Sequence, residues 1–300
     1  MNKKILVTGG LGFIGSNLVD FLVRKKLRDD KVFVMDNHQS ESSYYEYKNE
    51  LVEKYIFDDV ANISQYSKVL GEDIDIIFHL AANARIQPSF ENPQQTVKNN
   101  ILGTLAVCDY AKKHNAKKIV YAGSSSFYTG SKLSPYSFSK WVGEEVCDLY
   151  TQIYKIPTIT ARFFNVYGNR QPIQGDFATV IGIFERQIAN GEDLTIYGDG
   201  EQKRDFTGIM DICRGLVDLW ENDVTGIYNL GSGKSYTLNE IADFFIKYSK
   251  SESKKVYLPK RINEAQDALP ADVEKTINDI NWKAIWDIEM YIESLYRENE

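Results

Sequence analysis

Histidine and cysteine are scarce in this chain of 300 residues, which contains three of each. None of the histidines has neighbours that would build a zinc centre or a Ser-His-Asp triad, so no metal site is expected. Cys108, Cys147 and Cys213 are odd in number, widely spaced and embedded in apolar sequence with a helical pattern. This pattern favours buried, reduced thiols over disulfides or a metal site. Any chemistry here therefore has to use other residue types.

The chain also lacks an excess of positive charge and any long apolar run. Its formal net charge of −7 argues against nucleic acid or an anionic membrane as the main partner. An anionic small molecule stays open, because one basic pocket can form on an acidic protein. No apolar run reaches the length of a membrane span, and residues 1–4 lead into a strand instead of a signal peptide. We therefore expect a cytoplasmic protein.

The first half of the chain contains a regular alternation of short aliphatic runs with helical patterns. The expected strands are Lys4–Thr8, Lys31–Asp36, Lys54–Phe57, Asp75–Leu80, Lys117–Ala122 and Pro157–Phe164. The expected helices are Phe13–Lys25, a stretch near Ile63–Leu70, Pro93–His114 and Tyr136–Tyr154. Apolar strands that alternate with helices indicate a parallel sheet covered on both faces. The predicted fold class is α/β, a Rossmann-type doubly wound sheet with ligands at the carboxyl ends of its strands.

The sequence changes character after residue 164. Glycine and glutamine gather in "YGNRQPIQGD", a helix is expected over Phe177–Asn190, and a last helix is expected around Trp282–Arg297. We interpret residues 1–164 as a dinucleotide-binding domain. We interpret residues 165–300 as a smaller α/β domain that holds a substrate, with some of its strands returning to the first domain.

A glycine-rich turn follows the first expected strand in "ILVTGGLGFIG". Gly9 suits a tight turn, Gly12 lets a pyrophosphate approach the backbone, and Gly15 allows close packing of helix on sheet. The helix that starts at Phe13 offers unpaired N–H groups and a positive dipole end to phosphates. Asp36 ends the next strand, 21 positions after Gly15, which is the spacing of a ribose-binding carboxylate. Together these features predict a dinucleotide site.

Asp36 also indicates which dinucleotide binds. A carboxylate accepts hydrogen bonds from both ribose hydroxyls but repels a 2′-phosphate, and "DNHQS" supplies no nearby arginine. NAD is therefore favoured over NADP. In "FDDVAN", after the third strand, Asp59 could bind the adenine amino group or cap a helix, and the sequence leaves both alternatives open.

Three Tyr-x-x-x-Lys patterns occur, and their positions separate them. Tyr44–Lys48 follows the second strand, and Tyr128–Lys132 spans Gly130 in a loop. Tyr136–Lys140 lies at the start of a helix with Pro135 near its first turn, so the four-residue spacing places both side chains on one face. This helix follows the fifth strand, whose end "GSSSF" supplies hydroxyl groups. We therefore interpret Tyr136 as a catalytic base, against the alternative of an ordinary buried aromatic residue.

A free tyrosine has a pKa of about 10 and is a poor base at neutral pH. A positive charge about 6 Å away, at an effective dielectric near 20, is worth roughly 3 kcal/mol, or about two pKa units. Lys140 is one such charge and an oxidised nicotinamide ring is another. We expect them together to bring the pKa of Tyr136 toward neutrality, less the part that desolvation removes.

The chain resembles the extended short-chain dehydrogenases/reductases, specifically the nucleotide-sugar epimerases and dehydratases. The likeness covers nearly all of the chain and rests on "TGGLGFIG", "HLAA", "NNILGT", "SSSFY", "YSFSK", "RFFNVYG" and "YGDGEQKRDF". It implies tightly held, recycled NAD, oxidation at sugar C4 to a 4-keto intermediate, and a nucleotide-diphosphate sugar as substrate. It also implies a homodimer through a four-helix bundle of the helices at Pro93–His114 and Tyr136–Tyr154.

The resemblance implies roles for individual residues. Ser124 would form a hydrogen bond with the C4 oxygen of the sugar beside Tyr136, and Lys140 would hold the nicotinamide ribose. Contacts to the cofactor are expected for Gly9, Gly12, Phe13, Ile14, Gly15, Asp36, Asn37, Asp59, Val60, Leu80, Ala81, Ala82, Asn99, Tyr136, Lys140 and Phe164. Contacts to the substrate are expected for Arg85, Ser124, Ser126, Asn165, Arg204 and Arg261. Arginine suits the diphosphate because its guanidinium is a fork of donors; the alternative for Arg204 and Arg261 is a surface ion pair.

One short segment separates epimerase from dehydratase. Dehydratases of this family carry Thr-Asp-Glu or a close variant there, because loss of water needs an acid and a base beyond the tyrosine. The carboxylate positions are occupied by Ser125 and Ser126, and related decarboxylases also use a glutamate at the position of Ser126. Epimerisation needs no such carboxylate, since the 4-keto sugar rotates and hydride returns to its other face. A UDP-glucose or UDP-N-acetyl-sugar 4-epimerase is the favoured interpretation.

Two departures from the family leave the sugar open. The segment from Ser124 to Tyr136 lacks about a dozen residues that are common in relatives. Gly208 lies where relatives often carry a residue with a ring. The alternatives are a 4,6-dehydratase, an epimerase of a GDP-, CDP- or dTDP-sugar, and a protein that senses NAD without catalysis.

Overall fold

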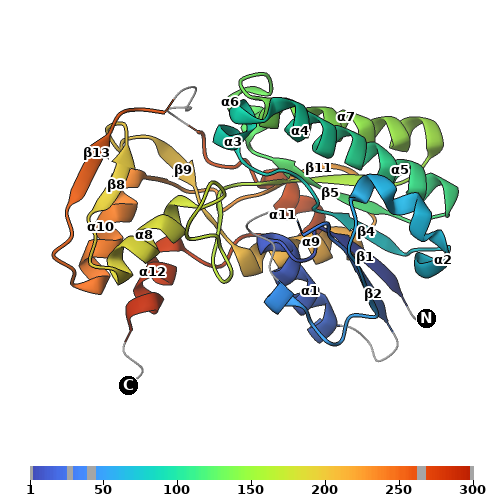
Figure 1. The fold of residues 1–300 in the computed structure, drawn as a ribbon, viewed down its shortest axis with the longest axis horizontal. Helices are drawn as coiled ribbons and strands as arrows, with labels where there is room; N and C mark the ends of the chain where they lie inside the picture. The colour runs from blue at the N-terminus through green and yellow to red at the C-terminus, as the bar shows by residue number, and fades with distance from the viewer. Residues whose placement is uncertain (1–2, 26–29, 39–44, 262–267, 298–300) are drawn as a thin grey trace. The chain divides into compact units, whose positions relative to one another are not determined.

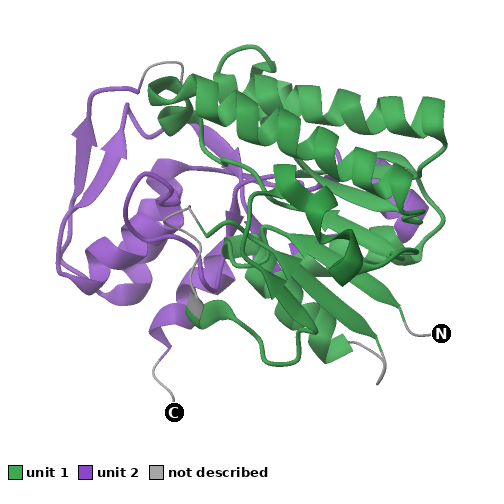
Figure 2. Cartoon of the chain, turned by 45° about the vertical axis from the view of Figure 1, so that its right-hand side comes forward, with its two compact units in different colours: residues 1–162, 213–228 green, residues 163–212, 229–300 purple. Residues whose placement is uncertain are grey.

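The computed structural model describes residues 3–25, 30–38, 45–261 and 268–297. Tyr44 lies outside the described residues. The chain forms two compact units (Figure 2), which are unit 1 with residues 1–162 and 213–228, and unit 2 with residues 163–212 and 229–300. Among the described residues, no helix combines the length and the hydrophobicity that a membrane span requires.

A seven-stranded sheet organises unit 1, with the strand order β11-β6-β5-β4-β1-β2-β3 (Figure 1). Its strands are β1 Lys4–Thr8, β2 Lys31–Met35, β3 Lys54–Ile56, β4 Ile76–His79, β5 Ile119–Ser124, β6 Thr158–Phe163 and β11 Gly226–Leu230. The pairs β1–β2, β1–β4, β2–β3 and β4–β5 are parallel. The order reverses at β1, where a doubly wound sheet opens its ligand crevice.

The apolar character of these strands explains why helices cover the sheet on both faces. Strand β4 is buried along its whole length, as is all of β2 after Lys31. Helices α4, α5 and α7 cover one face, and α1 and α9 cover the other (Figure 1). Their bounds are α1 Phe13–Lys25, α4 Pro93–Val97, α5 Gly103–Lys113, α7 Pro135–Tyr154 and α9 Ile209–Glu221.

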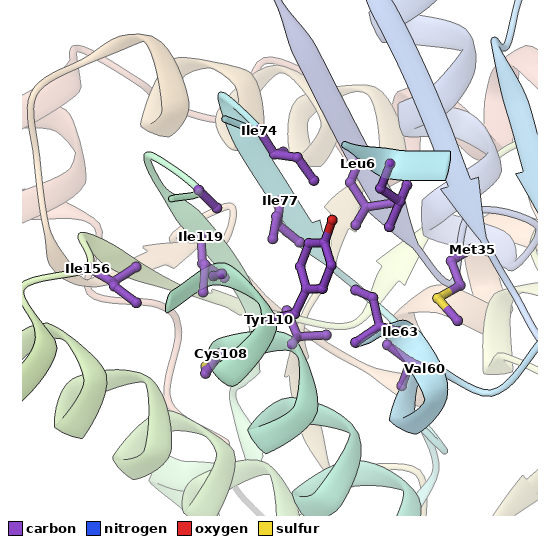
Figure 3. Packing of buried hydrophobic residues seen from close by; sticks show 14 of the residues in the cluster. Leu6, Met35, Val60, Ile63, Ile74, Ile77, Cys108, Tyr110, Ile119 and Ile156 are labelled. Carbon is purple, nitrogen blue, oxygen red and sulfur yellow. The ribbon is translucent and has the colours of Figure 1, made fainter. Parts of the chain in front are cut away.

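The core of unit 1 lies between the sheet and α5. Figure 3 shows Tyr110 of α5 among Ile77 of β4, Leu6 of β1, and Ile63 from the segment after β3. The ring of Tyr110 is fully buried, and its hydroxyl donates to the carbonyl oxygen of Gly71 at 3.1 Å. The phenol therefore adds apolar area to the core without leaving its polar end unsatisfied. All three cysteines are buried free thiols.

The long helix predicted over Pro93–His114 is a composite. A π-helical segment, Lys98–Leu102, joins α4 to α5. The helix predicted near Ile63–Leu70 is likewise a 3₁₀ helix, Val60–Tyr66, followed by the single turn α2, Ser67–Leu70. Both are local changes of hydrogen-bond pattern, which hydrophobic periodicity does not report.

Unit 2 consists of short strand pairs and helices around a second core. The pairs are β7 Val166–Tyr167 with β10 Thr207–Gly208, β8 Leu194–Tyr197 with β13 Lys255–Leu258, and β9 Lys203–Asp205 with β12 Ser235–Thr237. Apart from α9, the helices of unit 2 are α8 Val180–Ala189, α10 Leu238–Ser249, α11 Glu274–Ile280 and α12 Ile288–Tyr296. Phe184 of α8 packs edge-on to Phe245 of α10, and both are fully buried.

The last helix starts later than its sequence pattern predicts. Helix α12 begins at Ile288, because Asp287 is its N-cap and accepts a hydrogen bond from the backbone N–H of Glu289. Trp282, the predicted start, is completely buried outside the helix, and its indole N–H donates to the carbonyl oxygen of Asp211 at 3.1 Å. A predicted helix over Trp282–Asp287 is therefore wrong. Tertiary burial of the indole determines the conformation of this stretch.

Candidate active site

The glycine turn between β1 and α1 is as tight as its sequence predicts. Gly9 has a φ of +71°, and a Cβ there would lie 2.7 Å from the backbone nitrogen of Ala81. A Cβ on Gly15 would lie 2.0 Å from the carbonyl oxygen of Gly9. The N–H of Gly12 donates to that same carbonyl oxygen at 3.2 Å. No larger side chain fits at Gly9 or Gly15, so helix α1 begins, at Phe13, directly against the end of β1.

Asp36 lies at the end of β2 and contacts the turn. Its Oδ2 accepts from the N–H of Leu11 at 2.9 Å, and its Oδ1 accepts from the N–H of His38 at 2.8 Å. An ionised carboxylate has about four acceptor positions. Ribose hydroxyls can therefore bind the same group while it orders the turn. This arrangement fits an adenosine ribose beside a pyrophosphate. Asn37 precedes His38 directly, and Ile14 lies in the first turn of α1.

Asp59 and Val60 follow β3. Asp59 caps the 3₁₀ helix, since its Oδ1 accepts from the N–H of Ala61 at 2.8 Å. The cap is one of the two alternatives left open by the sequence, and a contact from the other carboxylate oxygen to adenine stays a prediction. Val60 is buried, and a Cβ on Gly103 would lie 2.8 Å from its Cγ1.

A buried hydrogen-bond network follows strand β4 to the catalytic helix. His79 shares one hydrogen bond with Thr8 at 2.8 Å and another with Thr104 at 3.0 Å. Burial lowers the pKa of His79 to about 3, with the charge of Lys140 acting in the same direction. The imidazole is therefore neutral and serves as a bridge between strand and helix. Leu80, Ala81 and Ala82 continue from it, and the N–H of Ala81 donates to Thr8 at 3.3 Å.

The π-helical segment supplies two neighbouring asparagines to this network. Asn99 donates to the side chain of Asn83 at 3.3 Å. Asn100 donates to Ser139 at 2.8 Å, and Ser139 donates to the carbonyl oxygen of Tyr136 at 2.8 Å. The segment thereby ties the first turn of α7 to the end of β4. Sequence analysis identified Asn99 and missed Asn100, whose role depends on the local widening of the helix.

Ser124 and Tyr136 are brought together by β5 and α7. Ser134 caps α7 by accepting from the N–H of Ser137 at 3.0 Å, and Pro135 occupies the first helical position. Ser124 is 9% exposed, accepts from the N–H of Ser126 at 3.2 Å, and is hydrogen-bonded to the Tyr136 phenol. The backbone bond orients the hydroxyl of Ser124 so that its proton is available to the phenol oxygen.

Lys140 lies one helical turn after Tyr136 and is 4% exposed. Its Nζ is 4.2 Å from the ring centroid of Tyr121. Burial lowers the pKa of Lys140 to about 8, and the carboxylate of Glu144 partly opposes this. The ammonium is therefore buried and poised to titrate near physiological pH.

The pKa of Tyr136 differs from the value expected from sequence. Burial raises it above its usual value, while the hydrogen bond from Ser124 and the charge of Arg85 lower it. The protein alone therefore does not activate the phenol, because desolvation exceeds the opposing charges. Sequence analysis named Lys140 as the cation that lowers this pKa; it missed the electrostatic effect of Arg85, which precedes helix α3, Ile86–Glu91.

The remaining predicted residues belong to unit 2. Phe164 is buried, and Asn165 is exposed with a φ of +23°. The side-chain amide of Asn165 donates to the carbonyl oxygen of Asp205 at 2.8 Å. Arg204 donates to the carbonyl oxygen of Lys203 at 2.7 Å, and Arg261 lies 3.9 Å from the ring centroid of Tyr197.

Gly208 has a packing reason in this chain. A Cβ on Gly208 would lie 3.1 Å from the Cβ of Trp286. Trp286 is half exposed. Its ring therefore lies next to the position at which relatives often carry a residue with a ring. The short segment after Ser124 forms helix α6, Ser126–Gly130, where the pattern around Gly130 predicts a loop.

Comparison with known proteins agrees with this geometry. A sequence model of the NAD dependent epimerase/dehydratase family matches residues 5–231. The chain belongs to this family. The predictions of the family, of a Rossmann-type α/β fold and of NAD as the cofactor are thereby confirmed.

Relatives within the family include epimerases and decarboxylases. UDP-glucose 4-epimerase from Thermotoga maritima, solved with UDP-glucose, has a TM-score of 0.90 at 26% identity over 97% of this chain and 96% of that one. UDP-N-acetylglucosamine 4-epimerase from Methanobrevibacter ruminantium, solved with UDP-N-acetylmuramic acid, has a TM-score of 0.87 at 32% identity over 97% and 96%. UDP-N-acetyl-alpha-D-glucosaminuronate decarboxylase from Bacillus cytotoxicus is 31% identical, over 86% of this chain and 84% of the relative.

Proposed function

We propose that the protein is an NAD-dependent 4-epimerase of a UDP-sugar, with UDP-glucose or its N-acetyl counterpart as the substrate. One observation carries the proposal. Ser124 and Lys140 are buried and Tyr136 is partly buried, so they supply a hydroxyl, an ammonium and a phenol, and no carboxylate occurs between Ser124 and Tyr136. The set suffices to move a proton at C4, whereas dehydration and decarboxylation in this family use an acidic residue in that segment.

The proton chemistry follows from the contacts of the phenol. When bound, NAD accepts hydride from C4 and returns it. Tyr136 takes the proton of the C4 hydroxyl and later gives it back, and Ser124 donates a hydrogen bond to the C4 oxygen in both directions. Lys140 holds the nicotinamide ribose and adds positive charge. Tyr136 would act as a base only with oxidised cofactor bound, because the positive nicotinamide ring would supply the charge that the protein alone does not.

Two further residues near the catalytic set are proposed to contact the sugar. The Oγ of Ser126 is buried and has no hydrogen-bond partner among the described residues. A buried hydroxyl without a partner is unfavourable, and a sugar hydroxyl would satisfy it. Arg85 acts electrostatically on Tyr136, which supports its assignment to the substrate region. Asn165, Arg204 and Arg261 are proposed to bind the diphosphate, for which guanidinium groups have the matching donor geometry.

A homodimer is part of this proposal, as is a cytoplasmic location. Helices α5 and α7 expose apolar side chains, namely Leu105, Leu149, Ile153 and Tyr154. A surface depression on α4 and the π-helical segment is lined by Pro93, Gln94, Val97, Lys98, Ile101 and Leu102. Exposed apolar side chains on neighbouring helices are typical of protein interfaces, and pairing of these helices would build a four-helix bundle. Sedimentation of the purified protein tests the dimer.

The activity is tested by mixing purified protein with UDP-galactose or UDP-N-acetylgalactosamine, without added NAD. The expected result is interconversion of the C4 epimers, which nucleotide-sugar chromatography measures. Release of water or carbon dioxide from a UDP-sugar or UDP-uronic acid, without epimers, would contradict the proposal. Binding of NAD with no turnover of any nucleotide sugar would favour the NAD-sensing alternative.

A further inference from the structure

A buried ion pair lies within unit 1, between the catalytic helix α7 and strand β6. The Nε of Arg162 donates to both carboxylate oxygens of Glu144, at 3.1 and 3.2 Å, and its Nη2 donates to Oε2 at 2.6 Å. The two side chains are 5% and 4% exposed. Desolvation offsets most of the attraction in such a pair, so stability alone is a weak reason to bury it.

Glu144 shares a helix face with the catalytic residues. It lies one turn after Lys140 and two turns after Tyr136 on α7. A Cβ on Gly123, the residue before Ser124, would lie 2.9 Å from the Oε1 of Glu144. The carboxylate therefore occupies the space that this glycine leaves, and it packs against the end of the strand that carries Ser124.

Arg162 extends the contact to helix α6. Its guanidinium carbon lies 3.7 Å from the ring centroid of Phe127 and 5.0 Å from that of Tyr128. Stacking of guanidinium on an aromatic face is favourable, more so where water is excluded. Both rings follow Ser124 and Ser126 directly in the chain. One arginine thus connects β6, α7 and the segment that carries both serines.

The charge of the pair acts on the catalytic groups. The carboxylate of Glu144 raises the pKa of Lys140 against the effect of burial, and it also raises the pKa of Tyr136. The other titratable groups that face this region are Tyr121 of β5, His79 of β4, Cys108 of α5, Cys147 of α7, Tyr128 of α6 and Arg85 before α3. Arg162 is the direct counter-charge of Glu144.

We propose that Glu144 and Arg162 form a positioning pair, which anchors the Ser124–Tyr128 segment to α7 and cancels net charge behind Lys140 and Tyr136. The role assigned to the pair is exerted through the catalytic residues and involves no contact of its own with substrate or cofactor. The proposal rests on the proposed function only for the identity of those residues. If it holds, removal of either partner leaves a buried charge of one sign, and removal of both leaves none.

The test is a titration of Lys140 in cofactor-free protein, by NMR of lysine side chains labelled at Cε. The signal is assigned by its loss in Lys140→Arg. We expect Glu144→Gln to lower the pKa of Lys140 and Arg162→Gln to raise it, each by roughly half a unit or more. The double variant is expected to return close to the wild-type value. Glu145→Gln, an exposed neighbour on the same helix, is the control and should leave the titration unchanged.

Activity is measured separately on the same proteins. The pH profile of kcat/KM is expected to move to lower pH in Glu144→Gln and to higher pH in Arg162→Gln. Shifts of both single variants in the same direction, or a double variant that does not return, would overturn the positioning pair. If a single variant does not fold, Glu144→Asp and Arg162→Lys replace it, and both must titrate close to wild type. If the pKa of Lys140 shifts as expected but the protein has no epimerase activity, the proposed function is rejected and the positioning pair is retained. If the protein is an active epimerase but the pKa of Lys140 does not shift, the positioning pair is rejected and the proposed function is retained.

Discussion

Units 1 and 2 each bury a charged side chain, and they satisfy it in different ways. In unit 1, the ammonium of Lys140 lies over an aromatic ring, and burial lowers its pKa to about 8. In unit 2, Asp205 is completely buried and accepts hydrogen bonds from the backbone N–H groups of Ser232, Gly233 and Ala271 at 2.8, 2.9 and 3.0 Å. The first charge is held in an unfavourable state, whereas the second organises three loop positions.

The two buried charges have different roles. A group kept against its desolvation penalty is available for chemistry, because it can change protonation near neutral pH. A carboxylate surrounded by fixed N–H donors holds the chain in place. We therefore expect variants in unit 1 to lose activity without losing stability. Variants at Asp205 should lose stability first.

The largest expected effect is on catalysis in unit 1. Tyr136→Phe removes the proposed proton carrier and keeps the partly buried ring, so kcat should fall by about a thousandfold. The free energy of unfolding should change by less than about 1 kcal/mol, since the lost hydroxyl is balanced by less desolvation. Epimerisation rates and urea unfolding check the two halves of this prediction. Tyr154 is exposed at the end of α7, so Tyr154→Phe is the control and should behave as wild type. If Tyr136→Phe lost as much free energy of unfolding as it lost in activation free energy, the difference between the two units would disappear.

The largest expected effect on stability is in unit 2. Asp205→Ala leaves several backbone N–H groups without acceptors, and the free energy of unfolding should fall by roughly 3 kcal/mol. The pH profile of the remaining activity should be unchanged. Chemical denaturation measures the loss. Asp199→Ala, an exposed aspartate nearby, is the matched control. A fully stable Asp205→Ala protein would show that the loops are held by other contacts.

A stability gain is expected at Lys140. Its folded pKa of about 8 lies below the usual 10.5, so folding releases a proton between these values and stability rises with pH across that window. Below pH 8 the buried ammonium opposes folding. Lys140→Met should therefore raise the free energy of unfolding at pH 7 by about 2 kcal/mol and abolish the rise.

Urea unfolding of cofactor-free protein on both sides of the window checks this result. Lys113→Met replaces an exposed lysine on α5 and should change stability by less than about 0.5 kcal/mol. A loss of stability in Lys140→Met at pH 7 would mean that the ammonium is held favourably.

The smallest expected effect is at Ser126. Ser126→Ala removes a buried hydroxyl that has no partner among the described residues, so stability should hold or rise slightly. If this hydroxyl binds the sugar, KM for the UDP-sugar should rise about fivefold with kcat nearly unchanged. Steady-state kinetics measures the split, with Ser131→Ala as the control in the same segment. An unchanged KM would remove Ser126 from the substrate contacts.

The parts predicted well from sequence are those set by local chemistry. Glycines at Gly9 and Gly15 are dictated by backbone contacts of less than 3 Å, and Tyr136 and Lys140 are linked by helical spacing alone. The alternation of apolar strands with helices likewise predicts the doubly wound sheet. Each of these features can be identified within a short window of sequence.

The parts missed depend on pairs that are distant in the chain. Glu144 and Arg162 are partners only because β6 returns beside β5, and Asp205 meets Ala271 across 66 positions. The raised pKa of Tyr136 depends on burial, which spacing does not measure. The false helix start at Trp282 has the same origin, because burial of one indole outweighs a helical pattern.

The π-helical turn at Lys98–Leu102 also constrains how this chain can change in length. Such a turn accommodates one residue more than a regular helix over the same rise. Deleting one residue there would restore ordinary α-helical winding and change the directions of the side chains within the turn. Asn100 would then point away from Ser139, and the brace on the first turn of α7 would be lost. Insertions and deletions among homologous chains should therefore avoid these five positions, of which only Lys98 and Leu102 are exposed.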